Sequence, residues 1–425
     1  MKIKMQVNAQ PVRGTKDFLP TEMQIRDAVQ QIIVDMYKSY GFSHIQAPIM
    51  EDIARLDKSD GGENLALIFK ILKRGQKLDL SRPNLTEHDL ADMGLRYDLT
   101  VPLARYYANN RHLLPHPFKA LHMDRVFRAE RPQKGRYREF YQCDIDILGD
   151  ASTAAEKELI YVTSQAILAI GFRDFKIRVN DRRLLTDMVL SSGFTADEVP
   201  SVCIVFDKRD KVGLDGVRAE LTEKGFASSA IEKFMGFLSH PDFGSLEFAK
   251  TYARAEQVVT DLQQVIDDAN KMSAGRYCVV FDPSLVRGQG YYTGMVFEIS
   301  CGQYASSVGG GGRYDKMVGK ELGEDVPAVG FSIGFERICD VLMEHPEIFN
   351  PNADIKKLVL IYNETDDFAD VMAQAENLRR AGFWVNVQRR GKKLGKQLDN
   401  LMAAGYGYSF IFGEYQEPKK LEKKA

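Results

Sequence analysis

The most constraining feature of the sequence is the stretch from Arg125 to Asp146, which reads RVFRAERPQKGRYREFYQCDID. Two runs with strand character flank a loop that contains Pro132, Lys134 and Gly135, and this pattern predicts an antiparallel hairpin. Successive side chains of a strand point to opposite faces. One face of the second run is therefore predicted to carry cationic, aromatic, amide and acidic side chains in turn, namely Arg136, Arg138, Phe140, Gln142, Asp144 and Asp146.

This order of side chains suits a ligand with phosphates at one end, a planar base in the middle and an ammonium at the other end. An aminoacyl adenylate is such a ligand. The opposite face is mainly apolar and aromatic, so we expect it to be packed. A solvated, charged hairpin is the alternative that composition alone favours. Against it, Arg128 and Glu130 on the first run could face the same site.

The run RAERPQKGRYREFYQ resembles motif 2 of class II aminoacyl-tRNA synthetases, in the form that the histidyl-tRNA synthetase family carries. The resemblance implies that Arg128 and Arg136 bind the phosphates of ATP, with Arg128 also serving catalysis. It implies that Phe140 stacks on adenine and that Glu130 reaches the amino edge of that base. It further implies that the loop contacts the acceptor stem of tRNA through Gln133 and Lys134.

The segment GLRYDLTVPLARYY (94–107) offers a carboxylate and a hydroxyl at Asp98 and Thr100, which we expect on one face of a strand. Such a pair can hold an ammonium or an imidazole N–H, although turn chemistry is an equal alternative. The segment resembles the region of the family that binds the amino group and ring of histidine. The resemblance thus assigns histidine binding to Asp98, Thr100, Gln142, Asp146, Tyr291 and Tyr292.

The segment CVVFDPSLVRGQGYYTGMVFEIS (278–300) places Arg287 between glycines and aromatic residues. Its glycines do not form the dinucleotide fingerprint, and no βαβ unit follows. A cation beside Gly288 can approach a phosphate closely, because glycine lets the backbone yield. The segment resembles the family motif R-G-x-x-Y-Y, whose arginine assists attack on the α-phosphate, which implies that Arg287 is catalytic. The usual motif has Leu-Asp where this chain has Gln289 and Gly290.

Two further segments resemble family motifs. SSVGGGGRYDKMVG (306–319) is either a flexible hairpin or a floor flat enough for adenosine and histidine, and it resembles the glycine-rich segment of the family. VPAVGFSIGFERICDVLMEH predicts a strand and then a helix that begins near Gly334, with Arg337 in its first turn. A cation there gains nothing from the helix dipole, which argues for an anionic ligand. The segment resembles motif 3, whose arginine contacts the γ-phosphate.

The predicted fold is an α+β catalytic core built on an antiparallel sheet with flanking helices, with a helical insertion and a small α/β C-terminal domain. A helix over 21–40 and a strand around Pro48 resemble motif 1, which implies a homodimer. Residues 61–81 fit either a hairpin or a helix. The predicted divisions are a first core segment at 1–184, a helix-rich insertion at 185–272, a second core segment at 273–345, a linker at 346–357 and an anticodon-binding-like domain at 358–425, shortened at its end.

The C-terminal segment alternates strand and helix, which predicts parallel strands, and it resembles the class II anticodon-binding domain. Basic residues gather between Arg389 and Lys396. They suit an RNA backbone, with contacts from Arg389 and Arg390, although a solvated lysine face explains them nearly as well. The tail EYQEPKKLEKKA is polar, and we expect it to be disordered, leaving one sheet edge uncovered.

Charge and cysteine content narrow the function classes. The net charge is −2, so any RNA contact has to come from local patches. Five dispersed cysteines without a C-x-x-C pair indicate reduced thiols and no zinc site. The sequence shows neither a signal peptide nor a run of transmembrane length, so we expect a cytoplasmic protein without membrane contact.

The resemblance, which runs from about Val12 to Gly413, implies a histidine–tRNA ligase. It would join ATP and histidine into histidyl-adenylate and transfer the histidyl group to tRNA(His), with Mg²⁺ accompanying ATP and no metal held by the protein alone. The main alternative is a non-catalytic synthetase paralogue such as the regulatory subunit of ATP phosphoribosyltransferase. A general RNA-binding module would leave most of the site-like residues unexplained.

Overall fold

The computed structural model describes residues 9–58, 64–132, 135–287, 291–302, 305–351 and 355–422. The chain divides into two compact units, Met1–Phe349 and Asn350–Ala425. The domain boundaries within the larger unit stay a prediction. Several residues that the sequence singles out lie outside the described residues, namely Gln133, Lys134, Gly288, Gln289 and Gly290.

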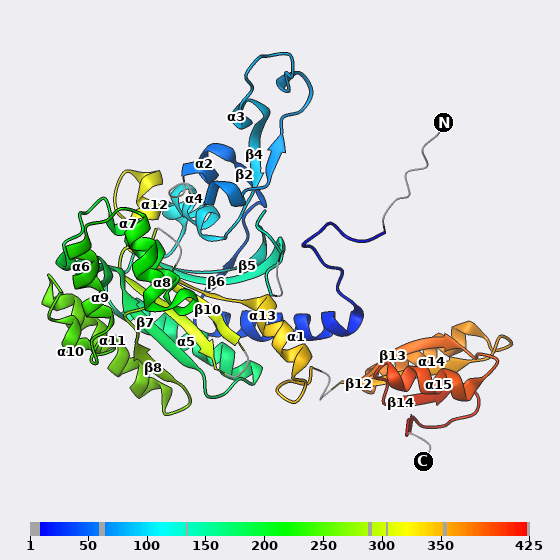
Figure 1. The fold of residues 1–425 in the computed structure, drawn as a ribbon. Helices are drawn as coiled ribbons and strands as arrows, with labels where there is room; N and C mark the ends of the chain where they lie inside the picture. The colour runs from blue at the N-terminus through cyan, green and yellow to red at the C-terminus, as the bar shows by residue number, and fades with distance from the viewer. Residues whose placement is uncertain are drawn as a thin grey trace. The chain divides into compact units, whose positions relative to one another are not determined.

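The larger unit is organised around an eight-stranded sheet (Figure 1) with the order β1-β5-β6-β11-β10-β9-β7-β8. The neighbouring strands from β5 to β7 pair antiparallel, and only the outer pairs β1–β5 and β7–β8 are parallel. The predicted α+β core with an antiparallel sheet is confirmed. The strands are β1 (Ser43–Ile45), β5 (Phe118–Phe127), β6 (Glu139–Leu148), β7 (Lys176–Asp181), β8 (Cys278–Phe281), β9 (Met295–Cys301), β10 (Ala305–Arg313) and β11 (Ala328–Ile333).

The predicted hairpin is formed by β5 and β6, which pair antiparallel from Phe118↔Leu148 to Phe127↔Glu139. The alternation predicted for the second run holds along β6, because Cys143, Ile145 and Ile147 are buried in the core behind the sheet. Arg138 is the exception. It precedes the strand and donates to the carbonyl oxygens of Glu130 and Arg13, each at 3.2 Å, so it does not share the predicted face.

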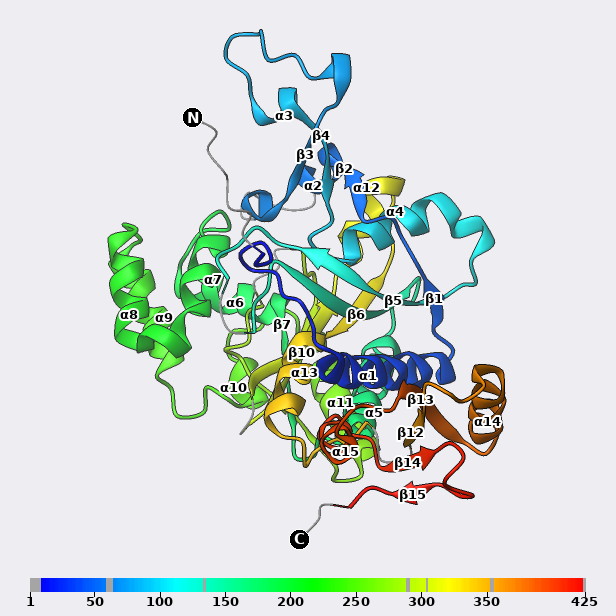
Figure 2. The same cartoon turned by 90° about the vertical axis from the view of Figure 1, so that its right-hand side faces the viewer.

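Helices cover the face of the sheet that carries these apolar side chains. Figure 2 shows α1 (Pro20–Ser39) running beneath the strands, close to α13 (Phe335–Glu344) and α5 (Ala154–Ile170). A buried ion pair joins α1 to α13, with Arg26 donating to Glu336 at 2.5 and 2.9 Å. The predicted helix over 21–40 is confirmed.

The segment predicted to be helix-rich consists of six helices at one side of the sheet (Figure 1). Their apolar side chains, including Phe206 and Phe234, join the same core as the sheet. The helices are α6 (Arg182–Ser192), α7 (Val199–Asp207), α8 (Arg209–Glu223), α9 (Ser228–Leu238), α10 (Leu246–Ala249) and α11 (Glu256–Ser273).

A small antiparallel sheet projects from the core (Figure 1), in the strand order β2-β4-β3. It contains β2 (Met50–Asp52), β3 (Lys70–Leu72) and β4 (Ala91–Leu95), with the short helices α2 (Ile53–Lys58) and α3 (Glu87–Leu90). In the segment 61–81, strand β3 lies between the single turns η1 (Asn64–Leu67) and η2 (Gly75–Lys77). Neither a hairpin nor a long helix forms among the described residues there. Pro48 separates β1 from β2, which belong to different sheets.

The prediction of a strand through Asp98 and Thr100 is wrong. Strand β4 ends at Leu95, and α4 (Thr100–Asn110) begins at Thr100. The Asp98 carboxylate accepts a hydrogen bond from the Val101 backbone N–H at 3.1 Å, which satisfies an amide of the first helical turn. The two side chains are therefore brought together by a helix start and not by the pleat of a strand. The remaining helices of this unit are η3 (Arg111–Leu113) and α12 (Asp315–Leu322).

The smaller unit has the predicted alternation of strand and helix. Strands β13 and β14 lie on either side of β12 and both pair parallel to it. The tail was predicted to be disordered, which is wrong as far as Lys420, because β15 (Lys419–Lys420) pairs antiparallel with β14 and covers its edge. The elements are β12 (Lys356–Tyr362), α14 (Phe368–Arg380), β13 (Phe383–Arg389), α15 (Leu394–Ala403), β14 (Tyr408–Ile411) and β15.

Candidate functional site

A cavity of about 660 Å³ lies over the face of the sheet opposite the helices, in the larger unit. All twelve described residues that the sequence assigns to nucleotide, histidine or catalysis line this one cavity. They come from the segment that joins β5 to β6, from β6 itself, from the start of α4, from the segment before β9 and from the start of α13. They are Asp98, Thr100, Arg128, Glu130, Arg136, Phe140, Gln142, Asp146, Arg287, Tyr291, Tyr292 and Arg337.

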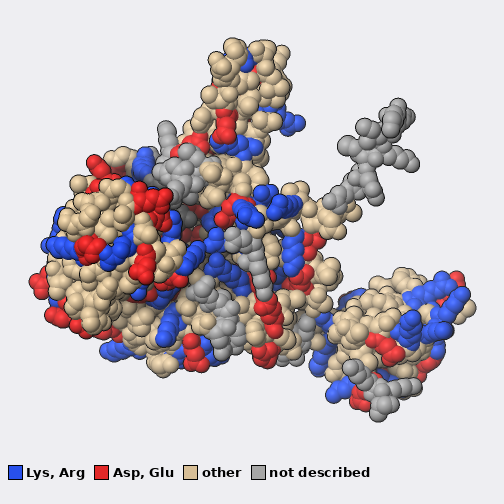
Figure 3. Space-filling model, viewed as in Figure 1, with Lys and Arg blue, Asp and Glu red and all other residues tan. Residues whose placement is uncertain are grey.

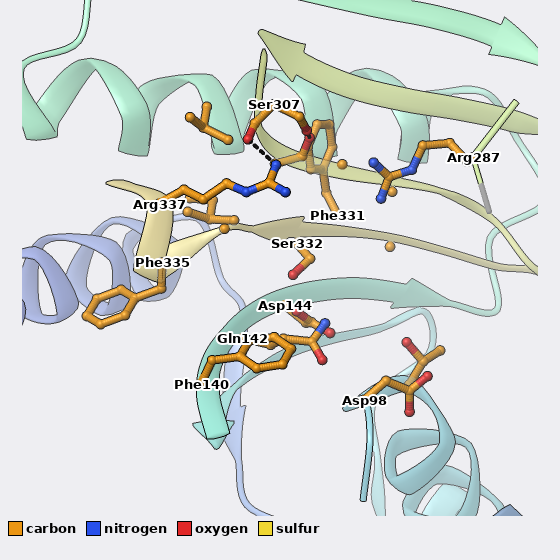
Figure 4. Close-up of a pocket in the computed structure, with 18 of the residues that line it drawn as sticks. Asp98, Phe140, Gln142, Asp144, Arg287, Ser307, Phe331, Ser332, Phe335 and Arg337 are labelled. Atoms are coloured by element: carbon orange, nitrogen blue, oxygen red, sulfur yellow. Dashed lines mark hydrogen bonds between the residues drawn. The ribbon is translucent and has the colours of Figure 1, made fainter. Parts of the chain in front are cut away.

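The cavity has two chemically different ends. Figure 4 shows the guanidiniums of Arg287 and Arg337 pointing toward one another from opposite ends, above strand β6. Phe140 lies below the Arg337 end, and Asp98 lies at the Arg287 end. Figure 3 shows Lys and Arg side chains gathered at the centre of this face of the larger unit. Such a cavity can hold an elongated ligand that carries negative charge near the arginines.

Arginines dominate the end of the cavity near α13. Arg337 donates to the Ser307 carbonyl oxygen at 2.6 Å. Burial, and then the nearby Arg136, lower the pKa of Arg337. Arg128 lies with its guanidinium carbon 5.0 Å from the centre of the Phe140 ring and donates to the Tyr97 carbonyl oxygen at 3.0 Å. Cations that repel one another in this way are a natural site for phosphates.

Three carboxylates converge at the other end of the cavity. Asp98, Asp144 and Asp146 are each at most 5% exposed. Burial, and then the charge of Asp146, raise the pKa of Asp144 well above its usual range. Burial raises the pKa of Asp146 to about 7, with a contribution from Asp98, although a hydrogen bond from Tyr314 opposes the shift. A cationic ligand would relieve this repulsion.

Tyrosines enclose the acidic end of the cavity. The ring centre of Tyr291 lies 4.8 Å from that of Tyr292 and 6.0 Å from that of Tyr314. The Tyr314 hydroxyl donates to Asp146 Oδ1 at 2.5 Å, which fixes the position of that carboxylate. In contrast, Gln142 Oε1 accepts no hydrogen bond from any portion of the chain that the structure describes. This amide oxygen is available to a ligand donor.

The four glycines 309–312 form the floor of the cavity. They belong to β10, between β9 and β11, so the flat floor considered for this segment is present and the flexible hairpin is not. A Cβ atom on Gly311 would lie 2.0 Å from the Gly330 carbonyl oxygen, and one on Gly310 would lie 2.4 Å from Arg287 Nη1. Only hydrogen fits at these positions, which keeps the floor open to a planar ligand.

Sequence reasoning missed several contributors to the cavity. Asp144 was placed on the correct face of β6 but given no role. The helical segment was given no chemistry, whereas Asp207, the last residue of α7, lines the cavity. Glu298 on β9 does not line the cavity, but its carboxyl lies 3.2 Å from Arg287, which does. No local pattern marks Asp207 or Glu298, because the packing of segments far apart in the sequence brings them here.

Ion pairs partly neutralise the positive charge of the basic cluster in the smaller unit. Arg389 pairs with Glu364, and Arg390 pairs with Glu414. Both acidic partners come from outside the basic run, so no local pattern indicates them. Lys393 and Lys396 line a shallow groove of about 410 Å³ beside α15, together with Gln388, Gln397 and Asn400.

No helix among the described residues is long and apolar enough to cross a membrane.

A family model described as histidyl-tRNA synthetase matches residues 14–338. The chain is 43% identical over 421 residues to the histidine–tRNA ligase of Leifsonia xyli subsp. xyli, with 96% of each chain covered.

Two solved structures resemble the whole chain. Histidyl-tRNA synthetase from Nostoc sp. PCC 7120 matches with a TM-score of 0.75 and 28% identity, over 95% of this chain and 91% of that one. A protein from Bacillus halodurans C, described as an ATP phosphoribosyltransferase regulatory subunit/histidyl-tRNA synthetase, matches with a TM-score of 0.75 over 95% of this chain and 98% of that one. At 18% identity, the second likeness shows the fold alone.

Proposed function

The chain belongs to the histidyl-tRNA synthetase family and is a histidine–tRNA ligase, and from this premise we propose how its residues carry out the reaction. The observation that carries the proposal is a cavity with several arginines at one end and buried carboxylates at the other, where Arg287 also lies. ATP and histidine occupy it together, with the triphosphate toward the arginines and the amino acid toward the carboxylates. This arrangement brings the histidine carboxylate next to the α-phosphate.

In the first step, an oxygen of the histidine carboxylate attacks the α-phosphorus of ATP. The bond from that phosphorus to the oxygen bridging to the β-phosphate breaks, and pyrophosphate leaves with the electron pair. Arg287 stabilises the charge that develops on the α-phosphate, an electrostatic role. Arg128 and Arg136 bind phosphates, with Arg128 also contributing to catalysis, and Arg337 binds the γ-phosphate.

The adenine ring stacks on Phe140, and Glu130 accepts a hydrogen bond from its amino group. Mg²⁺ enters with the substrate, bound to the phosphates of ATP. Among the described residues, no three His, Cys, Asp or Glu side chains are grouped as a metal site. We propose that the phosphates supply most ligands of this ion.

The histidine substrate is held by the acidic and tyrosyl end of the cavity. Its ammonium binds the carboxylates of Asp98 and Asp146, with Thr100 and Gln142 as further hydrogen-bond partners. Tyr291 and Tyr292 enclose its ring. These contacts are supported by the burial of the two carboxylates and by Gln142 Oε1, to which no described residue donates.

Histidine affinity should fall as the pH is lowered from about 8 to 6. The pKa of Asp146 is raised to about 7, so its carboxyl is protonated in the empty site below that pH. The Asp146 carboxyl must release this proton before it can hold an ammonium. Below the pKa, this release lowers histidine affinity by up to about tenfold for each pH unit. Calorimetry in two buffers with different ionisation enthalpies counts the protons released. Asp146→Asn should release fewer protons than the parent; equal numbers would contradict this assignment.

In the second step, a hydroxyl of the terminal adenosine of tRNA(His) attacks the acyl carbon, and AMP leaves. We propose that Gln133 and Lys134 contact the acceptor stem. The test is formation of labelled histidyl-tRNA from purified protein, ATP, histidine and tRNA, with periodate-oxidised tRNA as the control that lacks an acceptor. We also propose that the reaction takes place in the cytoplasm.

The smaller unit is proposed to bind tRNA through Arg389 and Arg390. Replacing both with alanine should weaken tRNA binding roughly tenfold at low salt and reduce its salt dependence, because two phosphate contacts are lost. Filter binding across a salt series measures both effects. Glu364→Gln is the matched control, since it frees Arg389 from its partner and should strengthen binding slightly. Unchanged salt dependence in the double variant would contradict this role.

We propose that the protein is a homodimer, assembled through α1 and the segment around Pro48. Strand β1 is an edge of the large sheet and β2 is an edge of the small sheet; Ile49 and Met50, at the start of β2, are 39% and 56% exposed. Apolar side chains next to a sheet edge are typical of a surface that a second subunit covers. Sedimentation at micromolar concentration should give about twice the chain mass, and Met50→Glu should shift the protein toward monomer. A monomeric parent would contradict the proposal.

The non-catalytic paralogue is not favoured. The relative that matches along 96% of the chain at 43% identity is a histidine–tRNA ligase, whereas the Bacillus halodurans structure supports the fold only.

A further inference from the structure

A line of alternating charges runs across the sheet and ends at Arg287. Glu298 on β9 lies opposite Arg178 on β7 and opposite Gly310 on β10. Directly opposed residues of neighbouring strands share one face of a sheet. The side chains of Arg178 and Glu298 therefore lie on the same side as the glycine floor under Arg287.

One carboxylate serves two arginines in this line. Glu298 Oε2 lies 3.2 Å from Arg287 Nη1, while Glu298 Oε1 accepts from Arg178 Nη2. Arg178 Nη1 also donates to Asp282 Oδ2 at 3.1 Å. Arg178 thus lies between two carboxylates, and Glu298 lies between two arginines.

The position of Arg287 is constrained from several directions. Its backbone has a φ of +57°, in the left-handed region that a residue with a side chain rarely adopts. Its guanidinium lies against the backbone of Gly310, where a Cβ atom would be 2.4 Å away. Glu298 holds the same guanidinium from the side. Together these contacts aim one charged group into the cavity.

The charges of the residues next to Arg287 matter as much as their positions. A carboxylate paired only with Arg287 would neutralise it and compete with a phosphate for its donors. We propose that Glu298 and Arg178 are positioning residues: Glu298 orients the Arg287 guanidinium, and Arg178 draws the charge of Glu298 away so that Arg287 stays available to the α-phosphate. This inference rests on the role proposed for Arg287 in adenylate formation.

The test is a double-mutant cycle on single-turnover adenylate formation. Arg178→Met keeps the length of the side chain but removes its charge, and we expect a loss of roughly tenfold in rate with histidine affinity unchanged. Adding Glu298→Gln removes the uncompensated carboxylate and should restore most of the rate. A purely structural ion pair would instead lower the thermal stability of Arg178→Met and leave the adenylate-formation rate of the folded protein near that of the parent.

Histidine calorimetry on each variant reports whether its site is folded. Arg183→Met is the matched control, since Arg183 pairs with Asp181 close to the end of β7, and it should keep the parent rate. A parent rate in Arg178→Met, or a double variant no faster than Arg178→Met, would overturn the inference. If Arg178→Met does not fold, Glu298→Gln alone decides, because the glutamine oxygen can still accept from Arg287 and so preserve its orientation. A loss of up to about threefold agrees with the proposal, and any larger loss overturns it. A parent protein without histidine-dependent activity would instead refute the proposed function.

Discussion

Replacing Arg287 with alanine should slow formation of histidyl-adenylate on the order of a hundredfold, equivalent to about 3 kcal/mol of transition-state stabilisation. Its guanidinium points into the cavity at the end where the buried carboxylates lie, which we propose to be the end that holds the amino acid. We propose that its charge acts on the α-phosphate, where negative charge develops during attack. Because we assign the histidine ammonium and ring to other residues, histidine affinity should stay near that of the parent.

Single-turnover formation of the adenylate and calorimetry with histidine measure these two quantities separately. Arg287→Lys is the informative companion, because it keeps a positive charge but loses the planar fork that reaches both Glu298 and a phosphate. We expect its rate to lie between those of the parent and the alanine variant. An alanine variant that forms adenylate at the parent rate would make Arg287 a structural residue.

Replacing Gly330 with alanine should weaken histidine binding by roughly tenfold to a hundredfold, the effect of about 1–3 kcal/mol for a displaced buried hydrogen-bonding group. The new Cβ atom would lie 2.0 Å from Asp146 Oδ1. That carboxylate has little freedom to move away, because it is buried and held by the Tyr314 hydroxyl at 2.5 Å. The substitution therefore displaces the group that we assign to the ammonium.

Histidine calorimetry measures this loss, and thermal unfolding of the same variant shows whether the core has survived. Gly236→Ala is the matched control. Gly236 lies within α9, and a Cβ atom there would meet nothing within 4 Å. This control should bind histidine normally and be slightly more stable, since alanine favours a helix over glycine. Parent affinity in Gly330→Ala would mean that Asp146 does not contact the ligand.

The wall of the site along β6 was predictable from the sequence because a strand has a strict period of two. Phe140, Gln142 and Asp144 face the cavity, while Cys143 and Ile145 between and beyond them are buried behind the sheet. An apolar back face and a polar front face leave only one orientation for such a strand. The arginine at the start of α13 was predictable on other grounds, since a helix N-terminus disfavours an unpartnered cation.

Other regions of the site depend on tertiary structure. The pair Asp98 and Thr100 was placed on a strand, because the spacing of two residues fits a strand face as well as it fits the start of a helix. Asp98 accepts from the Val101 N–H, and this contact marks the helix start. Glu298 and Arg178 are separated by 120 positions, and only the pairing of β7 with β9 makes them neighbours. Local sequence carries no signal for such a contact.

Histidine-dependent exchange of labelled pyrophosphate into ATP tests the central claim most directly, because it requires only the first reaction and no tRNA. The proposed site predicts exchange with histidine and little with the other amino acids, since the acidic, tyrosyl end must recognise both an ammonium and an imidazole. It also predicts that exchange is lost on the order of a hundredfold in Arg287→Ala. Absence of exchange in a folded protein that binds histidine, or equal exchange with unrelated amino acids, would contradict the proposed site.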